Sequence, residues 1–141
     1  MDAPYRPTVH TQAELEGVWA RLMGPWGFGR RSIWMVRLDE ERALLPVITE
    51  IAECDGLPDP ELASGLADVL AGLDEDGIGG SFAFLISRPG GSRVLDDDLI
   101  WGRMILEAGH RAGVKLEPLH LATDEATLPL PPDELVTRRS A

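Results

Sequence analysis

Three segments of the chain repeat apolar residues at every third or fourth position, which is the spacing of an amphipathic helix. The first follows Thr11-Gln12-Ala13-Glu14, where threonine and glutamate have capping-box spacing, and it ends at Gly24-Pro25. The second follows Asp59-Pro60, and the third follows Asp96-Asp97-Asp98 and ends at Gly113. The apolar stripes of the three predicted helices are Leu15, Val18, Trp19 and Leu22; Leu62, Leu66, Val69, Leu70 and Leu73; and Ile100, Trp101, Met104, Ile105, Ala108 and Ala112.

Four other segments are rich in the β-branched and aromatic residues typical of strands. Residues 32–38 and 43–51 flank a short charged turn and predict a hairpin, in which Pro46 favours an edge position or a bulge because it lacks an N–H. Residues 81–87 are almost continuously apolar, which indicates a central strand covered on both faces. Residues 114–123 predict the last strand, before a proline-rich tail.

The order of these elements predicts an α/β fold in which helices sandwich a mixed β-sheet. The helix between the hairpin and residues 81–87, and the helix after Gly91, are long enough to serve as crossovers. We expect residues 1–141 to form one domain, with residues 1–10 and 136–141 flexible at its ends.

Composition narrows the setting in which the protein works. A formal charge of −11 repels phosphate backbones, so nucleic-acid binding is disfavoured. Cys54 has no partner for an internal disulfide, and the first eleven residues do not have the pattern of a secretion signal. The apolar runs are also too short to span a bilayer, so we expect a cytoplasmic protein without a membrane anchor.

From about Ser32 onward, over roughly the last three quarters of its length, the chain resembles the JAB/MPN metalloprotease-like family, and especially its RadC-type branch. The resemblance lies in the turn Ile86-Ser87-Arg88-Pro89-Gly90-Gly91, the helix start Asp96-Asp97-Asp98, the helix text Leu106-Glu107-Ala108-Gly109 and the strand entry Gly113-Val114. In that family a hairpin and a helix lead to a buried strand, a His-x-His-Pro-Ser-Gly turn and an aspartate that opens the next helix. The chain also resembles small actinobacterial proteins with a similar Arg-Pro-Gly segment, which implies no activity.

The same resemblance implies that the family's zinc site is missing. Its active members hold zinc with two histidines and an aspartate, and a glutamate accepts the proton of the bound water. Ile86 and Arg88 occupy the histidine positions, whereas Asp98 matches the aspartate and Glu50 the glutamate. Because isoleucine has no donor atom and arginine stays protonated, we expect no metal and no cofactor. The chain's histidines are scattered and form no pair with metal-ligand spacing: His10, His110 and His120.

The turn after residues 81–87 remains a candidate ligand site. It follows a strand and approaches a helix start, as phosphate-binding loops do, and ligands of open α/β sheets bind beyond the carboxyl ends of strands. The candidate residues are Arg88, Gly90, Gly91, Asp97, Asp98 and Glu50. The structural alternative is that the aspartates cap a helix and that Glu50 is an exposed charge at a strand end.

Tryptophan suggests a different surface. Trp19 and Trp101 fall on apolar helix stripes and are predicted to lie in the core. Trp26 and Phe28 stand among glycines and a proline, where burial is hard to arrange, so they are candidate interface anchors. We therefore predict a non-catalytic protein-interaction module that contacts a protein partner or a second copy of itself. The alternative is an enzyme or small-ligand protein that uses the turn around Arg88 and the cluster 96–98.

Overall fold

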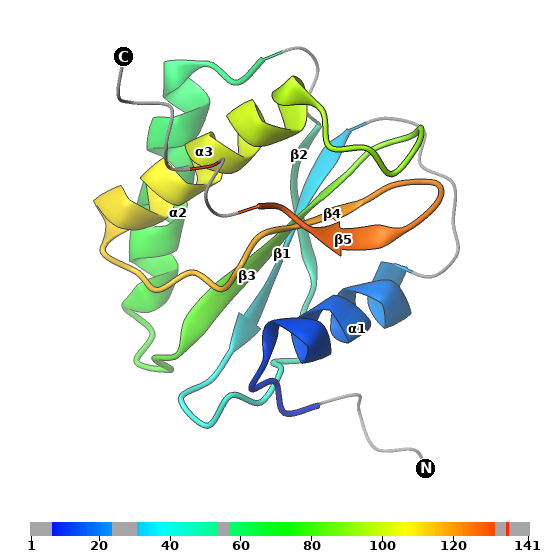
Figure 1. Cartoon of the computed structure of the whole chain (residues 1–141). Coiled ribbons are helices and arrows are strands. Elements are labelled where there is room, and N and C mark those ends of the chain that lie inside the picture. The colour runs from blue at the N-terminus through cyan, green and yellow to red at the C-terminus, as the bar shows by residue number, and fades with distance from the viewer. Residues whose placement is uncertain (1–6, 24–30, 54–56, 132–134, 136–141) are drawn as a thin grey trace.

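A computed structural model of the chain describes residues 7–23, 31–53, 57–131 and 135, which form an α/β structure (Figure 1). The elements in chain order are α1 (Gln12–Met23), β1 (Ser32–Leu38), β2 (Thr49–Glu53), α2 (Pro60–Asp74), β3 (Ser81–Ser87), α3 (Asp96–Ala112), β4 (His120–Ala122) and β5 (Thr127–Pro129). The strands form one five-stranded mixed sheet, and three helices pack against it. The predicted α/β class and mixed sheet are confirmed at this level.

The sheet has the strand order β2-β1-β3-β4-β5, so β3 lies at its centre. β1 pairs antiparallel with both β2 and β3, β3 pairs parallel with β4, and β4 pairs antiparallel with β5. α3 is the crossover between the parallel strands β3 and β4, and α2 connects β2 to β3 across β1. Every residue of β3 is buried, as its apolar sequence predicts.

The helices divide the hydrophobic core into two layers. α2 and α3 cover one face of the sheet, and α1 covers the other (Figure 1). Along β1, Ile33 and Met35 face the α2–α3 layer, whereas Val36 and Leu38 face α1. Trp101 lies in the first layer and Trp19 in the second, both fully buried, so their predicted places in the core are confirmed.

The helices begin where local sequence chemistry predicts. Thr11 Oγ1 accepts the N–H of Glu14 at 3.1 Å, and the Glu14 carboxylate accepts the N–H of Thr11 at 3.0 Å, which completes the capping box. Asp59 accepts the N–H of Leu62 at 2.8 Å. α3 ends at Gly113, whose φ of 71° is the left-handed conformation that glycine adopts most readily.

The predicted hairpin partner of β1 is interrupted. Ala43 and Leu44 form only isolated bridges, with Thr8 and Leu38, and β2 begins at Thr49 instead of continuing from there. Pro46 lies in the interruption, because it has no N–H to donate to β1. The predicted single strand 43–51 is therefore wrong, and Pro46 lies outside the sheet instead of at a bulge or edge position within a strand.

The C-terminal part of the sheet also differs from the prediction. The predicted strand 114–123 is reduced to β4, preceded by one bridge between Leu116 and Phe82. β5 was not predicted, because its three residues include Pro129 and its pairing with β4 is set by tertiary structure.

Residues 7–10 are packed against the domain, although they fall in the segment expected to be flexible. Val9 is fully buried in the α1 layer and donates its N–H to the carbonyl of Arg42 at 2.8 Å. The Arg42 guanidinium in turn pairs with Glu117 at 2.8 Å, and Glu117 is part of the segment between α3 and β4. Residues 1–6 and 136–141 lie outside the described residues.

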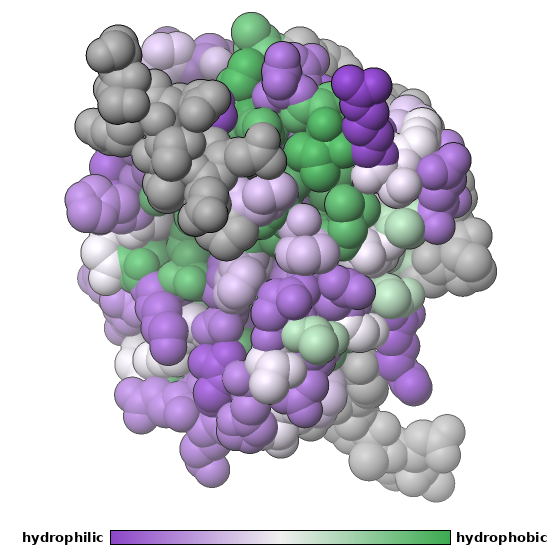
Figure 2. Space-filling view, viewed as in Figure 1, coloured by the Kyte–Doolittle hydropathy of each residue, from purple (hydrophilic) through white to green (hydrophobic). Residues whose placement is uncertain are grey.

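The surface is mostly polar on the side shown in Figure 2. Apolar side chains gather there over the N-terminal part of α3, while polar side chains cover the region of α1. Across the described ranges, none of the helices combines the length and the apolarity needed to cross a membrane.

Candidate functional site

The turn after β3 brings together Arg88 and Asp98, the central pair of the predicted ligand site. Arg88 Nε lies 2.8 Å from Asp98 Oδ1 and 3.1 Å from Oδ2, so the carboxylate receives this N–H between its two oxygens. The side chain of Arg88 is 6% exposed and that of Asp98 is 0% exposed. The two residues therefore form a buried ion pair between the end of β3 and the first turn of α3.

The turn itself accepts three further N–H donors of Arg88. Nη1 donates to the carbonyls of Pro89 and Gly91 at 3.0 and 3.2 Å, and Nη2 donates to the carbonyl of Arg93 at 2.6 Å. The guanidinium thus holds residues 89–93 around itself. An anionic ligand would have to displace these acceptors or Asp98 before it could bind Arg88.

Both carboxylate oxygens of Asp98 also accept hydrogen bonds from within the chain. Oδ2 accepts the N–H of Leu95 at 2.8 Å, so Asp98 closes the N-terminus of α3. Oδ1 also accepts from Arg31 Nη2 at 3.4 Å. The interpretation of Asp98 as a helix-capping residue is confirmed, although the N-cap position itself belongs to Leu95.

The other candidates of this turn do not converge on one point. Gly90 donates its N–H to Asp124 Oδ2 at 2.9 Å, and the Glu125 carboxylate lies against Gly91 and accepts the N–H of Ser92 at 3.0 Å. Asp97 is exposed in the first turn of α3. These carboxylates occupy the positions where an anion would sit, so the geometry favours a structural role for the turn. Ligand binding there stays a prediction.

Glu50 lies apart from the turn, exposed on β2. It pairs in the sheet with Trp34, whose side chain packs on the α1 layer, and β1 separates it from β3. Trp34 donates its indole N–H to Ser87 Oγ at 2.9 Å, next to Arg88 in the chain. The expectation that Glu50 is an exposed charge at a strand is confirmed.

The positions of the predicted missing zinc ligands are filled by structural contacts. Ile86 is fully buried in the core, and Arg88 is bound to Asp98. Among the residues that the structure describes, no three His, Cys, Asp or Glu side chains are grouped so that they could hold a metal ion.

His120 is the buried histidine of the described chain, on β4 facing α1. Its Nδ1 is 3.1 Å from the carbonyl of Pro118, so Nδ1 carries the proton, and Nε2 accepts from Gln12 Nε2 at 2.8 Å. Burial lowers the pKa of His120, although the Pro118 carbonyl and the charge of Glu16 partly oppose this. The side chain is neutral and held at both nitrogens, which fits a core histidine.

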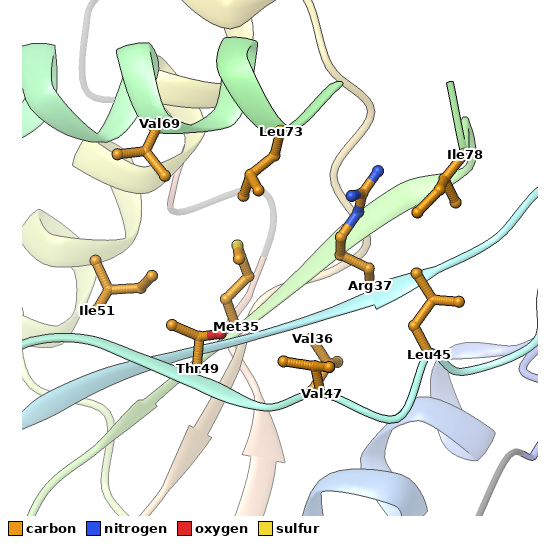
Figure 3. Close-up of a pocket in the computed structure, with 10 residues that line it drawn as sticks. All are labelled: Met35, Val36, Arg37, Leu45, Val47, Thr49, Ile51, Val69, Leu73 and Ile78. Atoms are coloured by element: carbon orange, nitrogen blue, oxygen red, sulfur yellow. The ribbon is translucent and has the colours of Figure 1, made fainter. Parts of the chain in front are cut away.

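A hollow lies elsewhere on the described part of the chain, between α2 and the β1–β2 edge of the sheet (Figure 3). This edge pocket has a volume of about 420 Å³. Apart from Arg37 and Thr49, the side chains that line it are apolar. The lining residues are Met35, Val36, Arg37, Leu45, Val47, Thr49, Ile51, Val69, Leu73 and Ile78.

The edge pocket lies beside the interruption at Pro46, whose neighbours Leu45 and Val47 line it. Figure 3 shows Val69 and Leu73 pointing down from α2 and Met35 pointing up from β1, while Val47, Thr49 and Ile51 line the edge below. A second hollow of about 210 Å³, on the α1 side, shares Val36, Leu45 and Val47 with it. Residues 45–48 are therefore loosely packed on both sides of the sheet.

Several lining side chains of the edge pocket remain exposed to solvent. Val47 is 65% exposed, Val69 is 49% exposed and Ile78 is 39% exposed. Val69 belongs to the apolar stripe predicted for α2, but Leu66 and Leu70 of that stripe are the ones that the core buries. The stripe is thus wider than the core beneath it, which is the sequence signal for the pocket that residue types alone did not single out.

Arg37 is the charged residue among those that line the edge pocket. Its side chain is 10% exposed, its guanidinium stacks over the Phe82 ring with 4.5 Å to the centroid, and it pairs with Asp76. The hydrogen bond from Arg37 and the N–H of Ile78 lower the pKa of Asp76. Arg37 Nε is buried without a hydrogen-bond partner. The positive charge is therefore neutralised at one end of an otherwise apolar hollow.

Arg37 is paired with Asp76, and the other charged side chains that we identify beside the edge pocket are carboxylates. From Ala43 to Ser87 the sequence contains no Lys, Arg or His, and every charged side chain is a carboxylate. Glu50 and Asp68 are exposed directly beside the lining residues Thr49, Ile51 and Val69. An apolar hollow thus sits in an acidic surround.

Neither a scan against known protein families nor a search of curated proteins finds a match to this chain. The predicted interface residues Trp26 and Phe28 lie outside the described residues, as does Cys54.

Proposed function

We propose that this chain is a non-catalytic protein-interaction module and that its edge pocket receives an apolar side chain of the partner protein. The observation that carries the proposal is an apolar hollow of about 420 Å³ whose lining is left half exposed by the chain's own core. Apolar pockets that accept an anchor side chain from a partner are typical of the energetic centres of protein interfaces.

The turn around Arg88 supports this proposal by contrast. Its charged groups are buried and matched to partners within the chain, which is typical of a structural role. The alternative, an enzyme or small-ligand protein that uses this turn, would gain support if purified protein carried a small anion that is lost in an Arg88→Lys variant.

The scaffold itself is proposed to be a JAB/MPN-like fold that lacks the zinc site. In favour of this are the order of hairpin, helix, buried strand, turn and aspartate-capped helix, together with Ile86 and Arg88 at the histidine positions. Elemental analysis of protein purified without chelator is expected to find no zinc. About one tightly held zinc per chain would contradict this proposal.

The test of the edge pocket uses a matched pair of variants. Val69→Gln removes a half-exposed apolar side chain from the pocket, and Leu95→Gln removes a 42% exposed apolar side chain at the start of α3, away from it. Burying the exposed half of the Val69 side chain against a partner would stabilise the complex by about 1 kcal/mol. Val69→Gln is therefore expected to weaken binding about fivefold.

Binding is measured by fluorescence anisotropy with labelled peptides that carry a central leucine between polar residues, and Leu95→Gln is expected to bind as the parent does. Equal affinity of the Val69→Gln variant and the parent would remove the edge pocket from the interface. Absence of binding by every peptide would contradict the proposed function. The predicted contribution of Trp26 and Phe28 has its own test, namely sedimentation of a Trp26→Ala, Phe28→Ala double variant with thermal melting as the control for folding.

A further inference from the structure

In the part of the chain that the structure describes, β2 is an outermost strand of the sheet, and it borders the edge pocket directly. The strand order places β2 outermost, paired on one side with β1. The opposite edge strand, β5, is contacted by α1, whereas β2 has no comparable contact with any helix of the described chain. An outermost strand presents a row of backbone N–H and C=O groups that another extended chain can pair with.

The two faces of β2 differ in chemistry. Thr49 pairs with Met35, and both line the edge pocket. Glu50 pairs with Trp34 and therefore points to the opposite face, because paired residues share a face of the sheet and neighbours alternate. A strand added beside β2 would meet an apolar hollow on one face and a carboxylate on the other.

The acidic surround excludes some occupants. A second copy of this chain that paired its own β2 with this strand would place Glu50 and its neighbouring carboxylates against the same groups, since the whole segment from Ala43 to Ser87 carries only negative charge. An acidic partner would meet the same repulsion. A basic segment would gain attraction on approach and a cross-strand partner for Glu50.

We infer that the partner presents a basic, extended segment in which apolar and Lys or Arg residues alternate, and that this segment adds to β2 as an outer strand. Its apolar residues face the edge pocket beneath Val69, and its basic residues lie on the face of Glu50. This inference rests on the proposed function and specifies the partner's chemistry and conformation.

The test uses three peptides with the same alternating leucine and valine residues. The intervening positions are Lys in the first peptide, Gln in the second and Glu in the third. We expect the Lys peptide to bind the full chain about tenfold more tightly than the Gln peptide, the Glu peptide to bind weakest, and added salt to reduce the difference. Glu50→Gln is expected to weaken binding of the Lys peptide and to leave the affinity for the Gln peptide unchanged.

Two further measurements test the extended conformation. Hydrogen exchange of the amides of Thr49–Glu53 is expected to slow in the complex, and N-methylation of alternate peptide residues that face β2 is expected to abolish binding, because it removes the backbone donors. Helical circular dichroism of the bound peptide, or unchanged exchange in β2, would overturn the inference.

The outcomes separate the inference from the function on which it rests. Equal binding of the three peptides would overturn the inference and leave the edge pocket as a binding site. Sedimentation that shows a dimer of the free chain, disrupted by Val69→Gln and not by Leu95→Gln, would identify a second copy as the occupant and would also overturn it. Failure of all three peptides to bind would contradict the proposed function.

Discussion

The turn after β3 and the edge pocket differ in how far the chain itself supplies partners for their side chains. At the turn, the buried charges of Arg88 and Asp98 are matched by partners from the chain itself. At the edge pocket, apolar side chains such as Val47 and Val69 are left without equivalent packing. The difference indicates that conspicuous charged residues can serve the fold itself, while apolar side chains stay exposed at the edge pocket.

The comparison predicts its largest effect at the turn. Asp98→Ala leaves the buried guanidinium of Arg88 without its carboxylate, which is expected to lower the free energy of unfolding by about 3–5 kcal/mol. Urea unfolding at neutral pH measures the loss. Asp97→Ala, next to it but exposed, is the control and is expected to change stability by about 0.5 kcal/mol or less. Similar small losses in both variants would mean that the buried pair of Arg88 and Asp98 does not stabilise the fold.

A second prediction compares two neighbours on α2. Leu70 is fully buried, so Leu70→Ala is expected to cost about 2–5 kcal/mol, whereas Val69→Ala is expected to cost less than about 1 kcal/mol because Val69 is 49% exposed. Urea unfolding of both variants gives the comparison. A loss at Val69 as large as that at Leu70 would show that Val69 belongs to the core and that the pocket is closed in solution.

Sequence reasoning located the helices because their signals are local. The capping box at Thr11, the N-cap at Asp59 and the terminal Gly113 each act through the residues of one turn. β5 and the edge pocket depend instead on which segments meet in space. Pro46 gave a signal for the interruption, but the hollow beside it also requires that Val69 extend beyond the core.

The candidate site was predicted from the resemblance and from the place of the turn between a strand and a helix, and neither shows which strands lie side by side. Arg88 and Asp98 do meet, as the resemblance implied, but their burial and their hydrogen bonds within the chain favour a structural role for the pair. Glu50 was grouped with them, yet β1 separates its strand from β3. Its position on the outermost strand of the described sheet, which only the sheet order reveals, gives it a different proposed role.

A third prediction concerns His120, a buried side chain whose two hydrogen bonds require the neutral form of its ring. Burial lowers its pKa in the folded chain, so the unfolded chain binds the proton more tightly and stability is lost as the pH falls below about 6.5, the ordinary histidine value. The slope cannot exceed about 1.4 kcal/mol per pH unit for one group. Urea unfolding between pH 7.5 and pH 5.5, values chosen to bracket roughly that pKa, measures the loss.

The matched control is His120→Gln, which cannot titrate, whereas the exposed His10 and His110 remain in both proteins. Its unfolding free energy is expected to change less over the same pH range. An identical pH dependence in the parent and the variant would assign the loss to other groups.

The most direct measurement of the central claim is a methyl NMR titration of the chain with the alternating Leu/Lys peptide. The account predicts that the methyl signals of Val47, Ile51, Val69 and Ile78 shift together and saturably, because these residues line the edge pocket. The methyl signals of Val9, in the α1 layer, are expected to stay in place. Shifts around Arg88 or at Val9, with none at Val69 and Ile51, would contradict the assignment of the edge pocket as the binding surface.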